Sequence, residues 1–206
     1  MDGTDVSQRS AIGPRVDDAS VVAATRAWLE RAVIGLSLCP FAKAVHQNDQ
    51  IRYVVSRATT VAALRRELAL ELRLLADSDP ERIETSLLML PDALASFLEF
   101  NEFLGVADAQ IQALGLSGEI QIASFHPGYQ FADSEPDAIE NFTNRSPFPT
   151  LHLLREESVE RAVQAFPDPA SIYEKNMTTL RALGDEGWRR VMAGGVASEP
   201  SGDSNA

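Results

Sequence analysis

The sequence predicts an α/β domain in which a small mixed sheet of about four strands packs with helices. Short apolar runs typical of strands alternate with longer amphipathic stretches, the order found in α/β proteins. Two strand-helix-strand passages favour parallel neighbours with right-handed crossovers, whereas the last two strands follow each other without a helix and can pair antiparallel. We expect two or three layers, with a ferredoxin-like sandwich or a thioredoxin-like order of elements as alternatives.

The first half of the domain contains two predicted helices and one strand. Apolar residues at helical spacing predict a helix that begins at Asp18 or Ser20 and ends between residues 35 and 38. Alternation over residues 51–55 indicates the first strand. A second helix follows to residue 77, where leucines form one apolar face: Leu64, Leu68, Leu72 and Leu75.

The second half repeats this alternation. The continuous apolar run 87–90 is typical of a strand buried on both faces, and a long helix is expected over residues 93–114. Strands are predicted over residues 119–125 and 150–154. The remaining helices are expected at 157–166, 169–183 and 185–192.

The two last strands are separated by residues 127–149, a segment with little helical or strand pattern. A connection of this length inside a compact domain is uncommon and usually serves a function or is disordered. Its aromatic residues argue against disorder: Tyr129, Phe131, Phe142 and Phe148. We therefore interpret this loop as the wall of a site.

Composition restricts the organisation and the partners of the chain. Residues 18–193 are expected to form a single domain between polar tails at 1–17 and 194–206. The 206 residues carry a net charge of -12, so nucleic acid is not an expected partner. No signal peptide or membrane span is recognised, which predicts a cytoplasmic protein without a membrane partner. The sequence assigns neither a cofactor nor an oligomeric state.

Two residues are candidates for catalysis. Cys39 is the chain's single cysteine and precedes Pro40, so it could lie at the start of a helix, where a thiolate is stabilised. The alternative is a cysteine that only packs in the core. His126 ends a predicted strand, where ligand sites gather in α/β sheets, although it could instead order the turn that follows.

Four further residues are candidates for ligand binding. Arg145 lies between Asn144 and Ser146, and together they offer donors suited to a carboxylate or phosphate. Arg145 could alternatively pair with an acidic residue of its own loop. Tyr129 completes the set as an aromatic wall. Because His126 and Arg145 leave the two ends of one loop, we expect them to line one pocket with Cys39 and Asn144.

Three uncommon strings occur in one order along the chain: Gly35-Leu36-Ser37-Leu38-Cys39-Pro40-Phe41-Ala42, Ser124-Phe125-His126-Pro127, and the run from Thr143 to Arg155. In this combination the chain resembles a family of bacterial proteins called domain of unknown function 1415. The resemblance covers roughly residues 19–192. It implies a single domain and no particular mechanism.

Two functions follow from these residues. One is an enzyme that acts on a small anionic substrate through Cys39 and His126, with Arg145 as the anion anchor. The other is a non-catalytic domain that binds a ligand or partner with the aromatic loop. A metal site is not expected; the set Cys39, His46, His126 and Asp133 has the right ligand types but no standard spacing.

Overall fold

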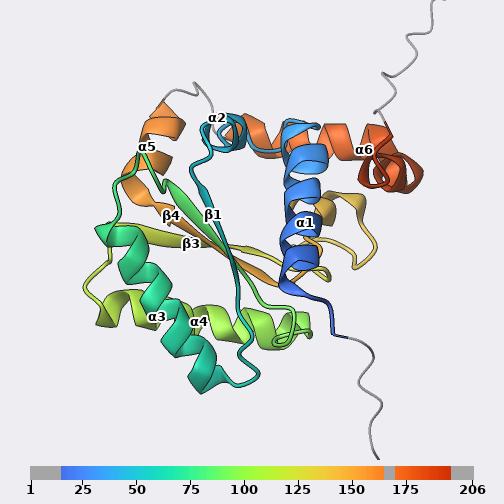
Figure 1. Cartoon of the computed structure of the whole chain (residues 1–206). Helices are drawn as coiled ribbons and strands as arrows, with labels where there is room; N and C mark the ends of the chain where they lie inside the picture. Colours follow the sequence, from blue (N-terminus) through green and yellow to red (C-terminus); the bar gives the residue numbers. More distant parts are fainter. Residues whose placement is uncertain (1–14, 165–169, 196–206) are drawn as a thin grey trace, which may run out of the picture.

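The computed structural model describes residues 15–164 and 170–195 (Figure 1). Most of the two predicted tails, residues 1–14 and 196–206, lies outside the described residues. The described end of the first tail contacts the domain, because Arg15 pairs with Asp92 and the carbonyl oxygen of Val16 accepts a hydrogen bond from Arg57.

A four-stranded mixed sheet forms the centre of the fold, as predicted. Its strands are β1 (Ile51–Val55), β2 (Thr85–Met89), β3 (Ile120–Phe125) and β4 (Thr150–Arg155), arranged in the order β1-β2-β4-β3. β1 and β2 are parallel, whereas β4 pairs antiparallel with both β2 and β3. From β1 onward the elements follow the strand-helix-strand-helix, paired strands, helix order of the thioredoxin-like alternative rather than the ferredoxin-like one.

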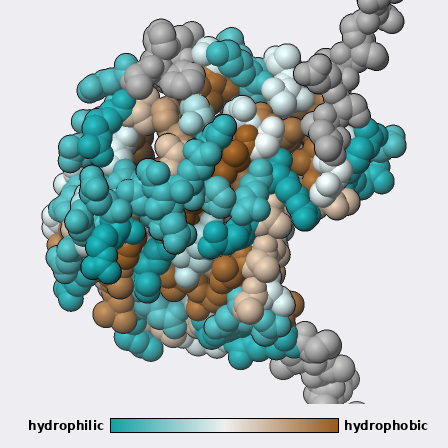
Figure 2. Space-filling view, turned by 45° about the horizontal axis from the view of Figure 1, so that its top comes forward, coloured by the Kyte–Doolittle hydropathy of each residue, from teal (hydrophilic) through white to brown (hydrophobic). Residues whose placement is uncertain are grey.

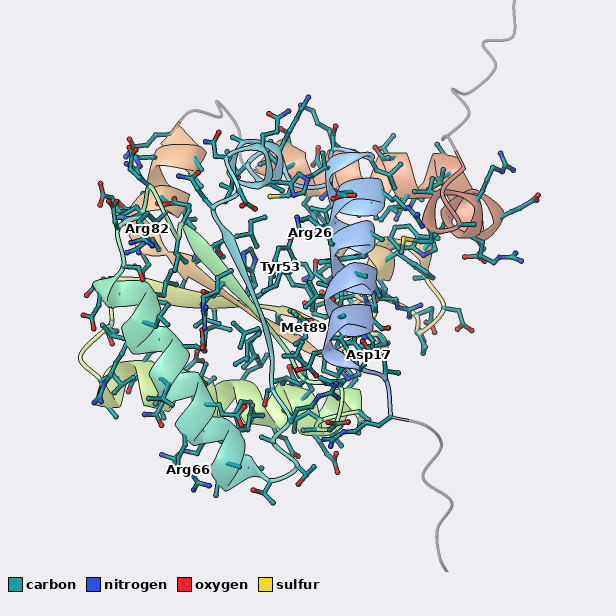
Figure 3. All side chains as sticks on the ribbon, in the orientation of Figure 1. Asp17, Arg26, Tyr53, Arg66, Arg82 and Met89 are labelled. Atoms are coloured by element: carbon teal, nitrogen blue, oxygen red, sulfur yellow. The ribbon has the colours of Figure 1, made fainter. Side chains whose placement is uncertain are left out.

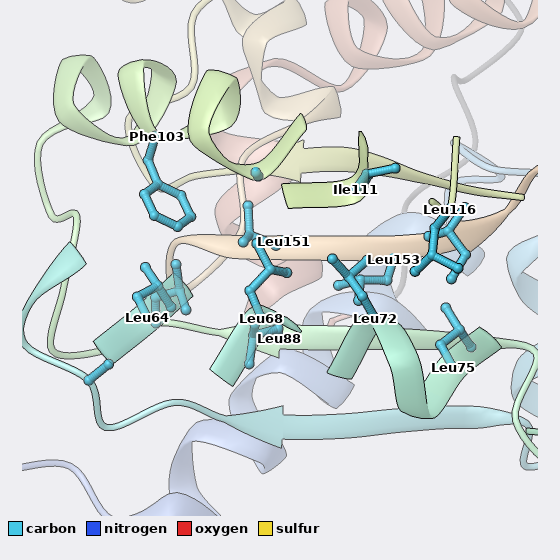
Figure 4. Close-up of a cluster of buried hydrophobic side chains, with 14 of the residues drawn as sticks. Leu64, Leu68, Leu72, Leu75, Leu88, Phe103, Ile111, Leu116, Leu151 and Leu153 are labelled. Atoms are coloured by element: carbon cyan, nitrogen blue, oxygen red, sulfur yellow. The ribbon is translucent and has the colours of Figure 1, made fainter. Parts of the chain in front are cut away.

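One face of the sheet is covered by α3 (Val61–Asp77) and α4 (Phe97–Ala113). The Thr60 hydroxyl begins α3 by accepting a hydrogen bond from the backbone N–H of Ala63 at 3.2 Å, as an N-cap residue does. The leucines of α3 point at Leu88, Leu151 and Leu153 of the sheet, and α4 closes the same cluster (Figure 4). This is the larger of the buried clusters.

The opposite face is covered by the two ends of the described chain. They contribute α1 (Asp18–Trp28), the π-helix η1 (Leu29–Ile34), α2 (Ala42–Gln47) and α6 (Ala170–Met192). Arg26 of α1 lies over the ring of Tyr53 on β1, 4.6 Å from its centroid (Figure 3). The result is three layers, with the sheet between two sets of helices (Figure 1).

Two helices differ from a simple continuous pattern. α6 contains Gly184 with φ of 62° and ψ of 177°, which separates two helical stretches as predicted. The first predicted helix changes to a π-helix at Leu29, which the hydrophobic spacing did not predict. Wider turns follow, in which Gly35 N donates to Glu30 O at 3.0 Å and Leu38 N donates to Val33 O at 2.9 Å. A Cβ atom at Gly35 would collide with the carbonyl oxygen of Arg31, so this turn requires glycine.

The core on the α3 face yields a prediction for stability. Leu68 and Leu70 lie on the same helix, but Leu68 is 0% exposed and Leu70 is 65% exposed. Leu68→Ala should lower the free energy of unfolding by about 2–5 kcal/mol, because it removes buried apolar surface and leaves a cavity. Urea unfolding measures this loss. In the matched control Leu70→Ala the change should stay within about 0.5 kcal/mol, and equal losses in both variants would contradict the assigned helix face.

Candidate functional site

A cavity of about 330 Å³ lies on the side of the sheet opposite α3 and α4. It is bounded by the sheet, by the segment from Trp28 through α2, and by α5 (Glu156–Gln164). Ligand pockets begin at about 300 Å³, so this cavity suits a small molecule. In Figure 2, where the top of Figure 1 comes forward, hydrophobic residues are visible between hydrophilic ones near the top of the molecule.

The floor of the cavity consists of side chains that alternate strands present on one face. The cross-strand row Leu87, His152 and Ala123 runs over β2, β4 and β3, and the next row contains Thr85, Leu154 and Gln121. Successive side chains of a strand point to opposite faces. Leu151 and Leu153 therefore enter the leucine cluster, while His152 between them faces the cavity.

The roof depends on the π-helix and the turn behind it. Wide turns place Leu29, Val33 and Cys39 over the floor, followed by Phe41, Ala42 and Val45. Cys39 N donates to Val33 O at 3.4 Å, which holds the cysteine close to the end of the π-helix. α5 supplies the remaining wall with Ser158, Val159 and Ala162.

His152 is the polar residue at the centre of the floor. Its ring stacks at a tilt against Phe125, with centroids 5.9 Å apart, and makes no hydrogen bond to the described residues. Burial among apolar side chains lowers the pKa of His152 to about 4. The imidazole is therefore neutral at neutral pH, with one nitrogen that donates and one that accepts.

Three other polar residues of the cavity are already bound to the protein, whereas the side chains of Glu84 and Gln121 make no hydrogen bond to the described residues. The Thr85 hydroxyl donates to Leu153 O at 2.6 Å, and the Ser158 hydroxyl accepts from Arg161. Arg155 donates through Nη2 to three backbone carbonyl oxygens, those of Leu75, Ser78 and Ile83. These residues shape the wall and hold its elements together.

Cys39 lines the cavity but does not lie at the start of a helix, one of the two positions considered for it. Phe41 occupies the N-cap position of α2, a helix of only six residues, so Cys39 precedes the first turn. The thiol makes no hydrogen bond to the described residues. Its position fits a contact residue of a binding cavity.

His126 is buried on the other side of the sheet, with 2% exposure. Its Nδ1 accepts from Gly128 N at 2.9 Å and its Nε2 donates to Leu94 O at 3.1 Å, while Phe97 and Phe100 contact the ring. Burial lowers the pKa of His126 and favours this neutral form. Both ring nitrogens are occupied, an arrangement that agrees with the turn-ordering role.

The candidate binding residues of the loop mainly bind the loop itself. Arg145 donates to Tyr129 O at 3.2 Å and to Pro136 O at 2.6 Å, with its guanidinium over the Phe142 ring. Asn144 donates to Ser124 O at 3.3 Å, and the Ser146 hydroxyl donates to Phe148 O at 2.6 Å. Burial raises the pKa of Tyr129, partly offset by its hydrogen bond with Asn144.

A residue that sequence analysis missed fixes the centre of this loop. Asn141 is 0% exposed and lies in a short 3₁₀-helix, η2 (Ile139–Thr143). Its Oδ1 accepts from Phe131 N and from the Ser134 hydroxyl, and its Nδ2 donates to the carbonyl oxygens of Glu135 and Pro136. Phe142 in turn packs against Trp188 of α6, with ring centroids 5.0 Å apart. The loop thus anchors α6.

The structure brings together some of the residues that the sequence grouped. His126 N donates to Asn144 O at 3.1 Å, and Arg145 donates to Tyr129 O in the same loop. Cys39 lines the cavity, whereas His126, Tyr129, Asn144, Arg145 and Ser146 do not. His126 follows β3 and faces α4, the layer opposite the cavity. Between residues 15 and 195, outside the gap at 165–169, no group of three or more His, Cys, Asp or Glu side chains is placed to hold a metal ion.

Residues 20–190 match the model of a family described as protein of unknown function, DUF1415. The chain belongs to this family. Comparison with curated proteins gives no match, and comparison with solved structures gives none either. Within the described ranges, no helix combines the length and the hydrophobicity needed to cross a bilayer.

The lowered pKa of His152 predicts a dependence of stability on pH. The unfolded chain binds a proton to this residue below about pH 6.5, whereas the folded protein does so only near pH 4. The contribution of His152 to the free energy of unfolding is therefore present above pH 6.5 and is lost as the pH falls toward 4. Between pH 7 and pH 5 the wild type should lose about 2 kcal/mol more unfolding free energy than His152→Gln.

Urea unfolding at both pH values measures this difference, and the other titrating groups cancel because both proteins contain them. His46→Gln provides the matched control, because it also removes a histidine but lies outside the cavity lining. That control retains His152 and should therefore keep the loss of stability that His152 causes. An equal dependence in wild type and His152→Gln would show that the His152 ring is solvated.

Proposed function

We propose that this protein binds a small, mainly apolar molecule in the cavity between the sheet, η1–α2 and α5. The observation that carries the proposal is the cavity itself, about 330 Å³ with walls that are predominantly hydrocarbon. A dry cavity of about 150 Å³ lined by aliphatic and aromatic side chains is large enough to bind benzene. Twice that volume suits a ligand of about two fused rings.

The origin of the walls supports this proposal. Each of the three strings on which the family resemblance rests contributes lining residues: Cys39 and Phe41 from the first, Phe125 from the second, and His152 and Arg155 from the third. These strings lie far apart in the sequence. Their convergence around one cavity favours a role for that cavity over a role for the loop alone.

Binding is favoured over catalysis by the state of the candidate groups. An activated cysteine needs a base within hydrogen-bonding reach, and the Cys39 thiol has no hydrogen bond to the described residues. The proposed anion anchor, Arg145, does not line the cavity and is held by the carbonyl oxygens of its own loop. A non-catalytic ligand-binding domain therefore agrees better with the geometry than an enzyme acting on an anionic substrate.

Filling the cavity tests the proposal. Wild-type protein should bind naphthalene, detected by saturation-transfer NMR and quantified by fluorescence titration. Ala123→Phe places a ring over the middle of the floor and should weaken binding at least about tenfold, because the added side chain occupies the ligand's space. Ala113→Phe, an exposed position at the end of α4, is the matched control and should leave the affinity unchanged.

A second measurement uses the single cysteine of the chain and needs no variant. Naphthalene should slow the alkylation of Cys39 by iodoacetamide, because the thiol lines the cavity that the ligand fills. Absence of naphthalene binding, or binding that Ala123→Phe leaves unchanged and that does not protect Cys39, would refute the proposal.

A further inference from the structure

His152 stands out among the polar groups of the cavity by its central position, and like Gln121 it has no hydrogen-bond partner for its side chain among the described residues. It lies at the middle of the central cross-strand row, flanked by Leu87 and Ala123, and the described residues offer its ring no hydrogen bond. His152 is half-buried and faces the cavity, so its ring nitrogens are within reach of whatever fills that space. Polar groups with little access to bulk water are nearly always hydrogen-bonded, to protein, to water or to a ligand. The imidazole therefore marks where a ligand's polar atom would bind.

The charged residues at the cavity wall do not favour a charged ligand. Arg155 commits Nη2 to three backbone carbonyl oxygens, and its Nε is buried without a partner and shielded from the cavity. Glu84 lines the same cavity and adds a negative charge to its wall. A carboxylate on the ligand would lose its hydration beside a second carboxylate and a guanidinium that backbone oxygens already hold, which is costly in an apolar site.

We infer that the ligand is an uncharged molecule with an apolar body and one hydroxyl group, and that this hydroxyl binds the His152 ring. The inference rests on the proposed binding function and specifies its ligand class. The hydroxyl donates to the unprotonated nitrogen of the imidazole, while Leu87, Ala123 and Phe125 contact the apolar body. Because the pKa of His152 is about 4, the nitrogen remains an acceptor at neutral pH.

Three probes that share one ring system separate the contributions of the apolar body, the hydroxyl group and a negative charge to binding: naphthalene, 2-naphthol and 2-naphthoate. At pH 7 the wild type should bind 2-naphthol roughly 2- to 10-fold more tightly than naphthalene, the gain expected of one neutral hydrogen bond. It should bind 2-naphthoate more weakly than naphthalene. In His152→Leu 2-naphthol should bind no more tightly than naphthalene, because the acceptor is gone while the cavity remains.

Gln121→Leu is the matched control, because Gln121 belongs to the neighbouring row of the same floor and also carries a polar group. This variant should keep the preference for 2-naphthol. Loss of the preference in Gln121→Leu, its survival in His152→Leu, or tighter binding of 2-naphthoate would each overturn the inference. In all three outcomes naphthalene still binds, whereas failure of naphthalene itself overturns the proposed function.

A spectroscopic readout keeps the test valid where His152→Leu fails to fold. The chain contains three histidines, so the His152 ring nitrogens can be assigned in long-range ¹H–¹⁵N spectra. Addition of 2-naphthol to the wild type should shift a His152 ring nitrogen, and naphthalene should shift it much less. Identical shifts with the two probes would exclude a hydrogen bond to the ring.

Discussion

Pairing of β4 between β2 and β3 sets the environment on both sides of the sheet. This strand is hydrogen-bonded on both edges, so its register determines which side chains enter which layer. In the observed register Leu151 and Leu153 complete the leucine cluster with α3 and α4, and His152 faces the cavity. The large core therefore fixes the position of the polar group on the opposite face: the residues that stabilise the fold and the residue at the floor of the cavity are immediate neighbours in one strand.

The strands and the two core helices were predictable because their signals are local. Alternation at residues 51–55 and the leucine spacing of α3 each identify an element and its buried face within a few residues. The π-helix was not predictable in this way. The spacing of Leu29, Val33 and Leu36 fits an ordinary helix, and the widened turns depend on tertiary contacts and on the close approach of Gly35 to Arg31. Roof residues of the cavity were consequently not recognised as a group.

The candidate site was predicted only in part, because the residue types did not show which face of the sheet each side chain would point to. Cys39 lines the cavity, but His126 was grouped with it because His126 ends a strand, where ligand sites gather in α/β sheets. Alternation along β3 contained the contrary signal: Phe125 faces the cavity, so the next residue faces α4. His152 alternates with leucines along β4, a pattern that favours a structural role. The same pattern places it on the other face, where the packing is incomplete. The aromatic loop looked like the wall of a site, yet its polar groups, centred on Asn141, satisfy its own backbone.

The π-helix makes the shape of the cavity depend on the number of residues in this segment. A turn of π-helix contains one residue more than a turn of α-helix. η1 is therefore equivalent to an α-helix into which one residue has been inserted. Loss of one residue between positions 29 and 34 would restore ordinary α-helical turns and rotate everything behind it by about 100° around the helix axis. Leu29 would keep its place while Val33 and Cys39 turned away from the sheet, and the roof would open on one side. A single deletion that leaves the leucine core untouched is thus enough to give related chains differently shaped cavities on the same sheet.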